Sequence, residues 1–183
     1  AGSRQLAAPA SPTRPTSDRI RESIFNRLDS HGLIAGANVL DLYAGTGALA
    51  FESLSRGAKS AELVENNKAA AAGCIKNGQA VVKSIETADG DATFRVHIMP
   101  VKTFLATAAT KKFELVFIDP PYDVSNQDLV HNLEDLVESL AEDFTVVVER
   151  SSRTDEPEWP SHYQCELRKD YGDTSVFWLS HAS

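Results

Sequence analysis

Residues 38–57 of the chain read NVLDLYAGTGALAFESLSRG, and this stretch decides the fold. A short apolar run ends at Tyr43, a turn containing Gly45 and Gly47 follows, and helical spacing then continues to about Arg56. A strand, a glycine turn and a helix in this order form the first half of a βαβ unit. The stretch therefore predicts a parallel sheet.

The same alternation continues toward the C-terminus. The sequence predicts further strands over residues 60–65, 93–99, 113–119 and 144–149, with helices from residue 67 onward, near 101–109 and near 127–140. Strands separated by helices make right-handed crossovers, which produce a parallel sheet covered on both faces. Residues 163–169 and 174–179 are strand-like runs on either side of Asp170-Tyr-Gly-Asp173, as in an antiparallel hairpin. Residues 78–91 remain open between continued helix and loop.

The N-terminal end differs in charge from the rest. Residues 1–28 hold five arginines and two acidic residues, a charge of +3, in a chain with a net charge of −8. Thr16 or Ser17 can cap a helix there, and Gly32 can end it. We expect residues 1–30 to form a basic segment and helix, and residues 31–183 to form the main domain. Contact with a polyanion is expected at the basic segment; an ordinary solvated helix face is the alternative.

Composition excludes several classes of protein. With 183 residues, 42% of them hydrophobic and 24% charged, the chain has the make-up of one globular domain. It has no apolar stretch long enough to span a bilayer and no secretory signal, so we expect a soluble, cytoplasmic protein without a membrane partner. An acidic single domain favours a monomer. Neither the two cysteines nor the five histidines are spaced as metal ligands, and no metal site is predicted.

The glycine turn is compatible with two kinds of cofactor. Gly45, Gly47 and Ala50 fit the G-x-G-x-x-A pattern of NAD-type dinucleotide-binding proteins, and Glu65 follows at the distance expected of an acid that binds a ribose. In a parallel sheet, glycines beyond a strand also allow backbone N–H groups to approach other ligands. This pattern alone does not separate the two.

Two further features favour methyl transfer. Asp41 lies on the strand, where its carboxylate can reach the amino end of a methionine-bearing cofactor rather than a pyrophosphate. Residues 119–122 read Asp-Pro-Pro-Tyr at the end of a later strand. Consecutive prolines fix the backbone and lack N–H donors, so that carbonyls and one carboxylate line the edge of the sheet. A stiff strand exit with a chance acidic residue is the alternative interpretation.

An acceptor cluster of this kind suits methylation of a nucleobase amine. If Asp119 and the Pro120 carbonyl accept the two N–H hydrogens, the nitrogen can direct its lone pair at an electrophilic methyl group. Asp119 would stabilise the positive charge that grows on the nitrogen, and Tyr122 would provide a flat face for the base. The methyl donor would be S-adenosylmethionine.

With these residues the chain resembles the bacterial 16S rRNA guanine-N2 methyltransferases, the RsmD family. The resemblance rests on four segments: RPTSDRIRESIFN at 14–26, DLYAGTGALAFESLSRG at 41–57, DPPY at 119–122 and YGDT at 171–174. It implies an α/β, Rossmann-like S-adenosylmethionine-dependent methyltransferase fold with a mostly parallel seven-stranded sheet ending in an antiparallel hairpin. It also implies methylation of a guanine N2 amine in 16S rRNA, with the assembled small ribosomal subunit as substrate.

The resemblance also implies roles for individual residues. The methionine end of S-adenosylmethionine would be lined by Asp41, Tyr43, Gly45 and Gly47, and its ribose would be held by Glu65. The catalytic edge would consist of Asp119, Pro120, Pro121 and Tyr122. The RNA-facing segment would use Arg14, Arg19 and Arg21.

Two other functions remain alternatives. A DNA adenine-N6 methyltransferase would use residues 119–122 in the same way, although 183 residues leave no room for a target-recognition domain. An oxidoreductase or regulatory module that binds an NAD-type dinucleotide would use Gly45, Gly47 and Ala50, but would leave residues 119–122 unexplained.

Overall fold

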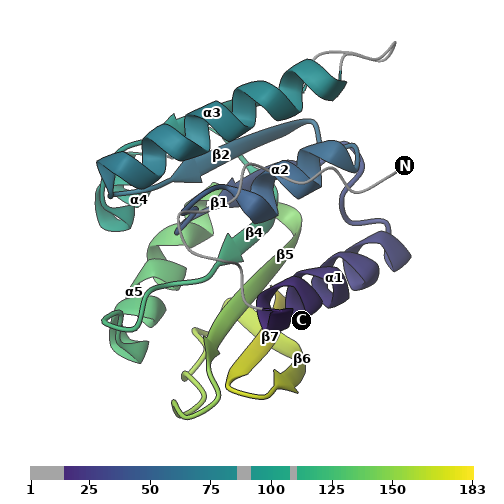
Figure 1. Cartoon of the computed structure of the whole chain (residues 1–183). Helices are drawn as coiled ribbons and strands as arrows, with labels where there is room; N and C mark the ends of the chain where they lie inside the picture. The colour runs from purple at the N-terminus through teal and green to yellow at the C-terminus, as the bar shows by residue number, and fades with distance from the viewer. Residues whose placement is uncertain (1–14, 86–91, 108–110) are drawn as a thin grey trace.

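The computed structural model describes residues 15–85, 92–107 and 111–183, which form a seven-stranded sheet flanked by helices (Figure 1). The strand order is β3-β2-β1-β4-β5-β7-β6. The strands are β1 (Asn38–Asp41), β2 (Ser60–Val64), β3 (Thr93–His97), β4 (Phe113–Ile118), β5 (Leu140–Ser151), β6 (Tyr163–Tyr171) and β7 (Thr174–His181). The first five strands are parallel, whereas β7 runs antiparallel to both β5 and β6.

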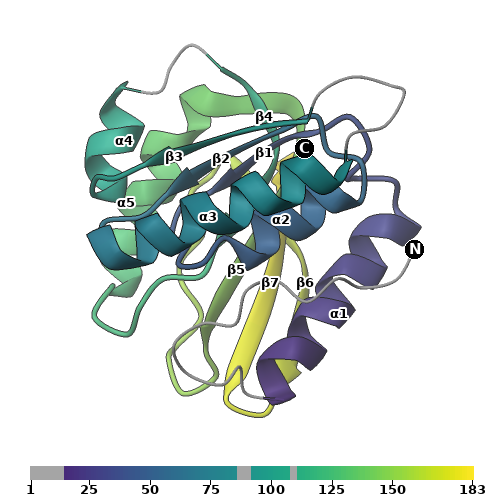
Figure 2. The same ribbon diagram turned by 45° about the horizontal axis from the view of Figure 1, so that its top comes forward.

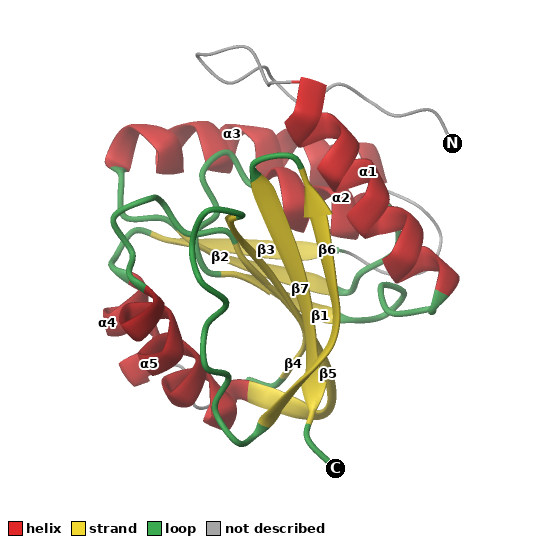
Figure 3. Ribbon diagram, turned by 90° about the horizontal axis from the view of Figure 1, so that it is seen from below, coloured by secondary structure: helices red, strands yellow, loops and turns green. Residues whose placement is uncertain are grey.

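Helices cover both faces of the sheet (Figures 2 and 3). One face carries α1 (Pro15–Ser30), α2 (Ala48–Ser55) and α3 (Lys68–Ile85), and the other carries α4 (Val101–Thr107), α5 (Asn126–Leu136) and a 3₁₀ turn at Val137–Ser139. Among the described residues, no helix is both long and apolar enough to cross a bilayer.

The core is divided by the sheet, because successive side chains of a strand point to opposite faces. On β1, Val39 belongs to the cluster under α1, α2 and α3, and Leu40 to the cluster under α4 and α5. On β4, Phe117 and Ile118 alternate in the same way. A polar side chain at the end of a strand therefore points to one of these two faces of the sheet, as the alternation along that strand dictates.

The predicted sheet, its parallel order and its closing antiparallel hairpin are confirmed. One boundary is wrong. The helix expected near 127–140 ends at Leu136, and Leu140 already begins β5 opposite Phe113 of β4. The apolar residues after Leu136 satisfy helical spacing equally well, and only pairing with the neighbouring strand decides between the two structures.

Residues 78–91, which the sequence left open between helix and loop, lie partly outside the described residues. The same is true of the helix predicted near 101–109. Helix α3 continues through Gly78 to Ile85, and residues 86–91 are not described. Helix α4 is described to Thr107, and residues 108–110 are not.

Helix α1 packs on the same core as the rest of the chain. Ile20, Ile24, Phe25 and Leu28 recur at helical spacing and are buried in the cluster under α1, α2 and α3. The helix starts at Pro15, whose fixed φ suits a first helical position, and a turn at Gly32 (φ 64°) follows it. Arg14 lies outside the described residues.

Candidate active site

A cavity of about 960 Å³ lies at the carboxyl ends of β1, β2, β3 and β4. Its lining includes Tyr43 and Gly45 after β1, Glu65 after β2, and Asp119 and Pro120 after β4. In a parallel sheet, loops that leave neighbouring strands meet at this edge, which is where ligands bind in such folds. The structure thus brings together residues that lie up to about eighty positions apart in the sequence.

The turn between β1 and α2 depends on its two glycines. Gly45 and Gly47 have φ values of 55° and 82°, in the left-handed region that other residues rarely adopt. A Cβ on Gly47 would also overlap the ring of Phe51 and lie 3.0 Å from the Cys74 Sγ. Gly45 lines the cavity. Gly47 is buried outside the cavity lining, so it determines the backbone conformation of the turn without facing the cavity.

Glu65 is held against the glycine turn. Its Oε2 accepts a hydrogen bond from the Gly45 backbone N–H at 2.8 Å, and its Oε1 accepts one from the Asn67 N–H at 2.7 Å. Each carboxylate oxygen has a further lone pair. The carboxylate lines the cavity in a fixed orientation from which it can accept hydrogen bonds from a pair of ligand hydroxyls.

Asp41, at the end of β1, is buried without a full set of partners. It is 2% exposed, and its Oδ1 accepts no hydrogen bond from the described residues. Burial, together with the nearby Asp119 carboxylate, raises the pKa of Asp41 to about 7, although the backbone N–H groups of Tyr43 and Ala50 act in the opposite direction. A buried carboxylate of this kind favours a donor or a positive charge beside it.

The Asp119–Tyr122 segment leaves β4 at the same edge. Asp119, Pro120 and Pro121 line the cavity, whereas Tyr122 lies outside the lining and is 96% exposed. Asp119 is exposed to solvent, yet the protein atoms around its carboxyl limit its hydration and raise its pKa to about 6. At neutral pH it is therefore mainly ionised and more basic than an ordinary aspartate.

Glu149 does not line the cavity, but it lies next to the site on β5, and the sequence interpretation missed it. It follows Val148 on β5, which pairs with Ile118 of β4, so the strand register places Glu149 beside Asp119. Burial and the carboxylates of Asp119 and Asp41 raise the pKa of Glu149 to about 8. An acid at the end of an apolar strand, as at Asp41 and Asp119, is the signal that could have identified it.

Tyr43 forms another part of the wall. Its hydroxyl accepts a hydrogen bond at 2.7 Å from the Nδ2 of Asn132, a buried residue of α5 that the sequence interpretation also missed. Burial raises the pKa of Tyr43, so the ring stays neutral. Across the cavity, Met99 and Pro100 after β3 and Val101 at the start of α4 supply a largely apolar wall.

The cavity and the N-terminal arginines are separate. Neither Arg19 nor Arg21 lines the cavity; Arg19 lines a groove beside α1, and Arg21 pairs with Asp18 at 3.1 Å. Arg14 lies outside the described residues. No cluster of three or more metal-ligating side chains occurs in the part of the chain that the structure describes.

The residues at this edge fit S-adenosylmethionine. The cofactor carries a sulfonium and an ammonium group, and the edge offers the unpartnered Oδ1 of Asp41 with further carboxylates around it. Glu65 presents acceptors for ribose hydroxyls, and the left-handed glycine turn keeps side chains out of the approach to the backbone. A pyrophosphate, by contrast, would be repelled by these carboxylates.

Comparisons with known proteins agree with the fold. A family model described as "Conserved hypothetical protein 95" matches residues 1–180. The ribosomal RNA small subunit methyltransferase D of Escherichia coli (strain K12) is 35% identical over 176 residues, which cover 94% of this chain and 82% of that protein.

Solved structures are similar over almost the whole chain. The protein yhhF from Escherichia coli superposes with a TM-score of 0.79 at 30% identity, covering 98% of this chain and 93% of that one. The rRNA methyltransferase aviRa from Streptomyces viridochromogenes superposes with a TM-score of 0.69 at 16% identity, covering 95% and 88%, which shows a shared fold alone. The predicted Rossmann-like methyltransferase fold is confirmed.

Proposed function

Because the chain belongs to the RsmD family, whose family model is described as conserved hypothetical protein 95, we propose that it is an S-adenosylmethionine-dependent rRNA methyltransferase. We further propose that it methylates the exocyclic N2 amine of a guanine in 16S rRNA, on the assembled small ribosomal subunit. The observation that carries the proposal is the position of Asp119 and Pro120 in the same cavity as Gly45 and Glu65.

The cofactor would be held by the residues around the glycine turn. Tyr43, Gly45 and Glu65 line the cavity, and Asp41 lies buried beside it at the end of β1. These residues would hold the methionine and ribose parts of the cofactor, while Gly47 keeps the turn in shape. When bound, S-adenosylmethionine supplies an electrophilic methyl group. The apolar wall at residues 99–101 would pack against the adenine and help to exclude water.

The catalytic edge acts on the guanine amine. The Asp119 carboxylate and the Pro120 carbonyl, neither of which donates a hydrogen bond at neutral pH, accept the two N2 hydrogens and so orient the nitrogen lone pair. With a pKa of about 6, Asp119 is ionised yet basic enough to take the proton that the amine loses. Pro121 fixes the backbone, and the exposed ring of Tyr122 stacks on the base.

The test is transfer of labelled methyl from S-adenosylmethionine to four acceptors: small subunits that lack the modification, naked 16S rRNA, duplex DNA and bulk protein. We expect N2-methylguanine in the small subunits, and the naked-RNA sample shows whether ribosomal proteins complete the substrate. Label in DNA adenine alone would support the adenine-N6 alternative. NAD binding without S-adenosylmethionine binding would refute methyl transfer.

A further inference from the structure

A second concave surface, a groove of about 510 Å³, is lined by residues of α1 and of the edge strand β6. Figure 3 shows the ribbons of these two elements. Its lining includes Arg19, Ser23 and Arg27 of α1, and Lys169 and Tyr171 of β6. We call it the α1–β6 groove. It shares no lining residue with the active-site cavity.

One side of α1 forms the first wall. Arg19, Ser23 and Arg27 are spaced four residues apart, so they lie on one helix face, beside the face that Ile24 and Leu28 bury in the core. Arg27 is half-buried with its guanidinium 5.1 Å from the ring centre of Trp178 on β7, which holds this cation in the groove.

Strand β6 forms the second wall. Lys169 and Tyr171 are two residues apart and therefore point to the same side of the strand. The Lys169 ammonium donates a hydrogen bond to the Ser23 Oγ at 3.4 Å and lies 5.2 Å from the Tyr171 ring centre, while the hydroxyls of Tyr171 and Ser23 are hydrogen-bonded to each other. These contacts hold Lys169 over the groove.

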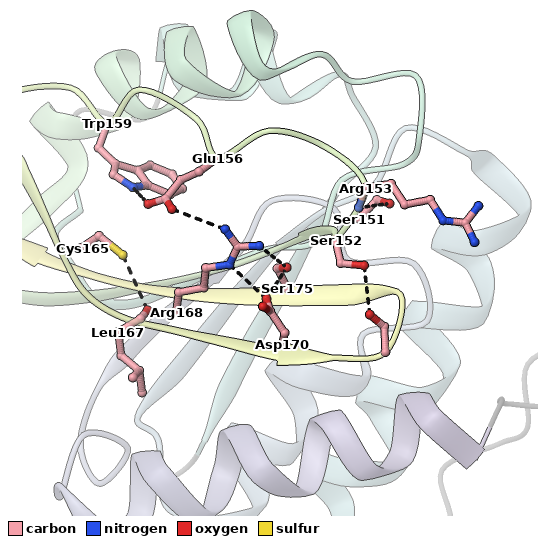
Figure 4. Close-up of polar contacts among 11 residues, drawn as sticks. Ser151, Ser152, Arg153, Glu156, Trp159, Cys165, Leu167, Arg168, Asp170 and Ser175 are labelled. Atoms are coloured by element: carbon pink, nitrogen blue, oxygen red, sulfur yellow. Dashed lines mark hydrogen bonds and ion pairs between the residues drawn. The ribbon is translucent and has the colours of Figure 1, made fainter.

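The neighbouring cation on β6 is engaged elsewhere. Arg168 points to the opposite side of the strand from α1, where it pairs with Asp170 at 3.0 Å and with Glu156 at 3.6 Å (Figure 4). Its charge is balanced by these acids, whereas Lys169 faces Arg19 and Arg27 across the groove. Alternate residues of one strand thus have different electrostatic surroundings.

The groove and the cavity differ in charge. The cavity repels a phosphate backbone, because it is lined by a single lysine, Lys102, and six acidic side chains. The acids are Glu65, Asp119, Asp123, Asp128, Glu134 and Asp135. The groove is lined by three cations, Arg19, Arg27 and Lys169, with one acid, Glu22. In a chain with a net charge of −8, an RNA substrate needs such a basic surface to counter this repulsion.

One end of the groove lies near the catalytic edge of the sheet, where β4 and β5 end. The turn after Tyr171 pairs β6 with β7 at Thr174, and Thr174 lies opposite Ser151, near the carboxyl end of β5. Strand β5 neighbours β4, which ends at Asp119. An RNA strand lying in the groove can therefore continue toward the catalytic edge.

We propose that the α1–β6 groove binds the phosphate backbone of the rRNA strand that flanks the target nucleotide, with Lys169 and Arg19 as contacts on its two walls. The inference rests on the proposed function, since it assumes an RNA substrate. It adds the edge strand β6 to a surface that the sequence placed only on the N-terminal arginines.

The deciding variant is Lys169→Gln, because Lys169 lies outside the N-terminal segment. Binding to small subunits that lack the modification is measured over a series of KCl concentrations. Loss of one phosphate contact lowers the slope of log affinity against log salt by about 0.7 and weakens binding about fivefold near 0.1 M salt. Combining it with Arg19→Gln should double the change in slope. We expect a raised KM for the subunits, with unchanged kcat and S-adenosylmethionine affinity.

Lys76→Gln on the exposed side of α3 is the matched control, since it removes one exposed lysine from a helix that does not line the groove. An equal effect of Lys76→Gln, or an unchanged salt slope in Lys169→Gln while the wild type methylates the subunits, would overturn the groove proposal alone. Absence of any rRNA methylation by the wild type would overturn the proposed function and this inference together.

Discussion

Asp119 has to meet two chemical demands at one position. It must be ionised to accept a hydrogen bond from an amine, and it must be basic enough to take up a proton. Limited hydration at the end of β4 raises its pKa to about 6, which satisfies both near neutral pH. The surroundings of the residue, rather than its identity alone, suit it to the proposed reaction.

Replacing Asp119 by alanine should lower turnover by roughly 100-fold or more, because one preorganised acceptor of the amine hydrogens is lost. The fold should be unchanged, and any change in S-adenosylmethionine affinity should be small beside the loss of turnover, because Asp41 and Glu149 remain at this edge. Single-turnover methyl transfer and a cofactor titration measure the two effects. Asp143→Ala, an exposed aspartate early in β5, is the control. Turnover near that of the wild type would remove Asp119 from the catalytic role.

Glu65→Ala should weaken S-adenosylmethionine binding by roughly 10- to 100-fold, the range expected when hydrogen bonds to a charged group are lost. The change also releases the Gly45 N–H that Glu65 holds at 2.8 Å. Calorimetric titration is the measurement, with the exposed Glu158→Ala as control. Equal affinities of the two variants would exclude Glu65 from the ribose site.

At the scale of elements, the β1–α2 turn joins the cavity to the core. Gly47 is the N-cap residue of α2, has a φ of 82° and packs directly against the buried Phe51. The conformation of the turn that lines the cavity therefore depends on how Gly47 packs against Phe51 in the core.

Gly47→Ala should destabilise the protein by about 1–3 kcal/mol, since the new Cβ meets both the left-handed backbone and the Phe51 ring. Chemical denaturation measures the free energy of unfolding. Gly73→Ala is the matched control, because Gly73 lies inside α3 with open space around it, and alanine there should stabilise by about 0.5–1 kcal/mol. If both variants were equally stable, the proposed strain at Gly47 would be wrong.

At the scale of the whole molecule, strands far apart in the sequence bring Asp41, Asp119 and Glu149 to one edge. Their pKa values are raised to about 7, 6 and 8, above those of an unfolded chain. Stability from these groups is therefore fully present below about pH 4 and is lost as the pH rises through 6 to 8. A bound cation at this edge would offset the repulsion.

We expect the Tm of the cofactor-free protein to fall by several degrees between about pH 5 and pH 9, and S-adenosylmethionine to bind more tightly over the same rise in pH. Glu149→Gln should reduce the fall in Tm. Glu142→Gln, which removes the same charge at the exposed start of β5, should leave it as in the wild type. Parallel pH profiles for all three proteins would contradict a coupled acidic edge.

The sequence by itself determined the order of strands and helices, the glycine turn and the acidic ends of β1 and β4. These depend on local spacing and on backbone conformations, such as those of Gly45 and Gly47, that few residues adopt. The end of α5 could not be found in this way, because Leu140 fits a helix or a strand until Phe113 lies beside it.

Only the tertiary structure decided which distant side chains share a site. It placed Glu149 beside Asp119, Asn132 on the hydroxyl of Tyr43, and Lys169 across a groove from Arg19. The reason is physical: pKa shifts and local charge depend on distances through space and on burial, which the spacing of residues along the chain does not specify.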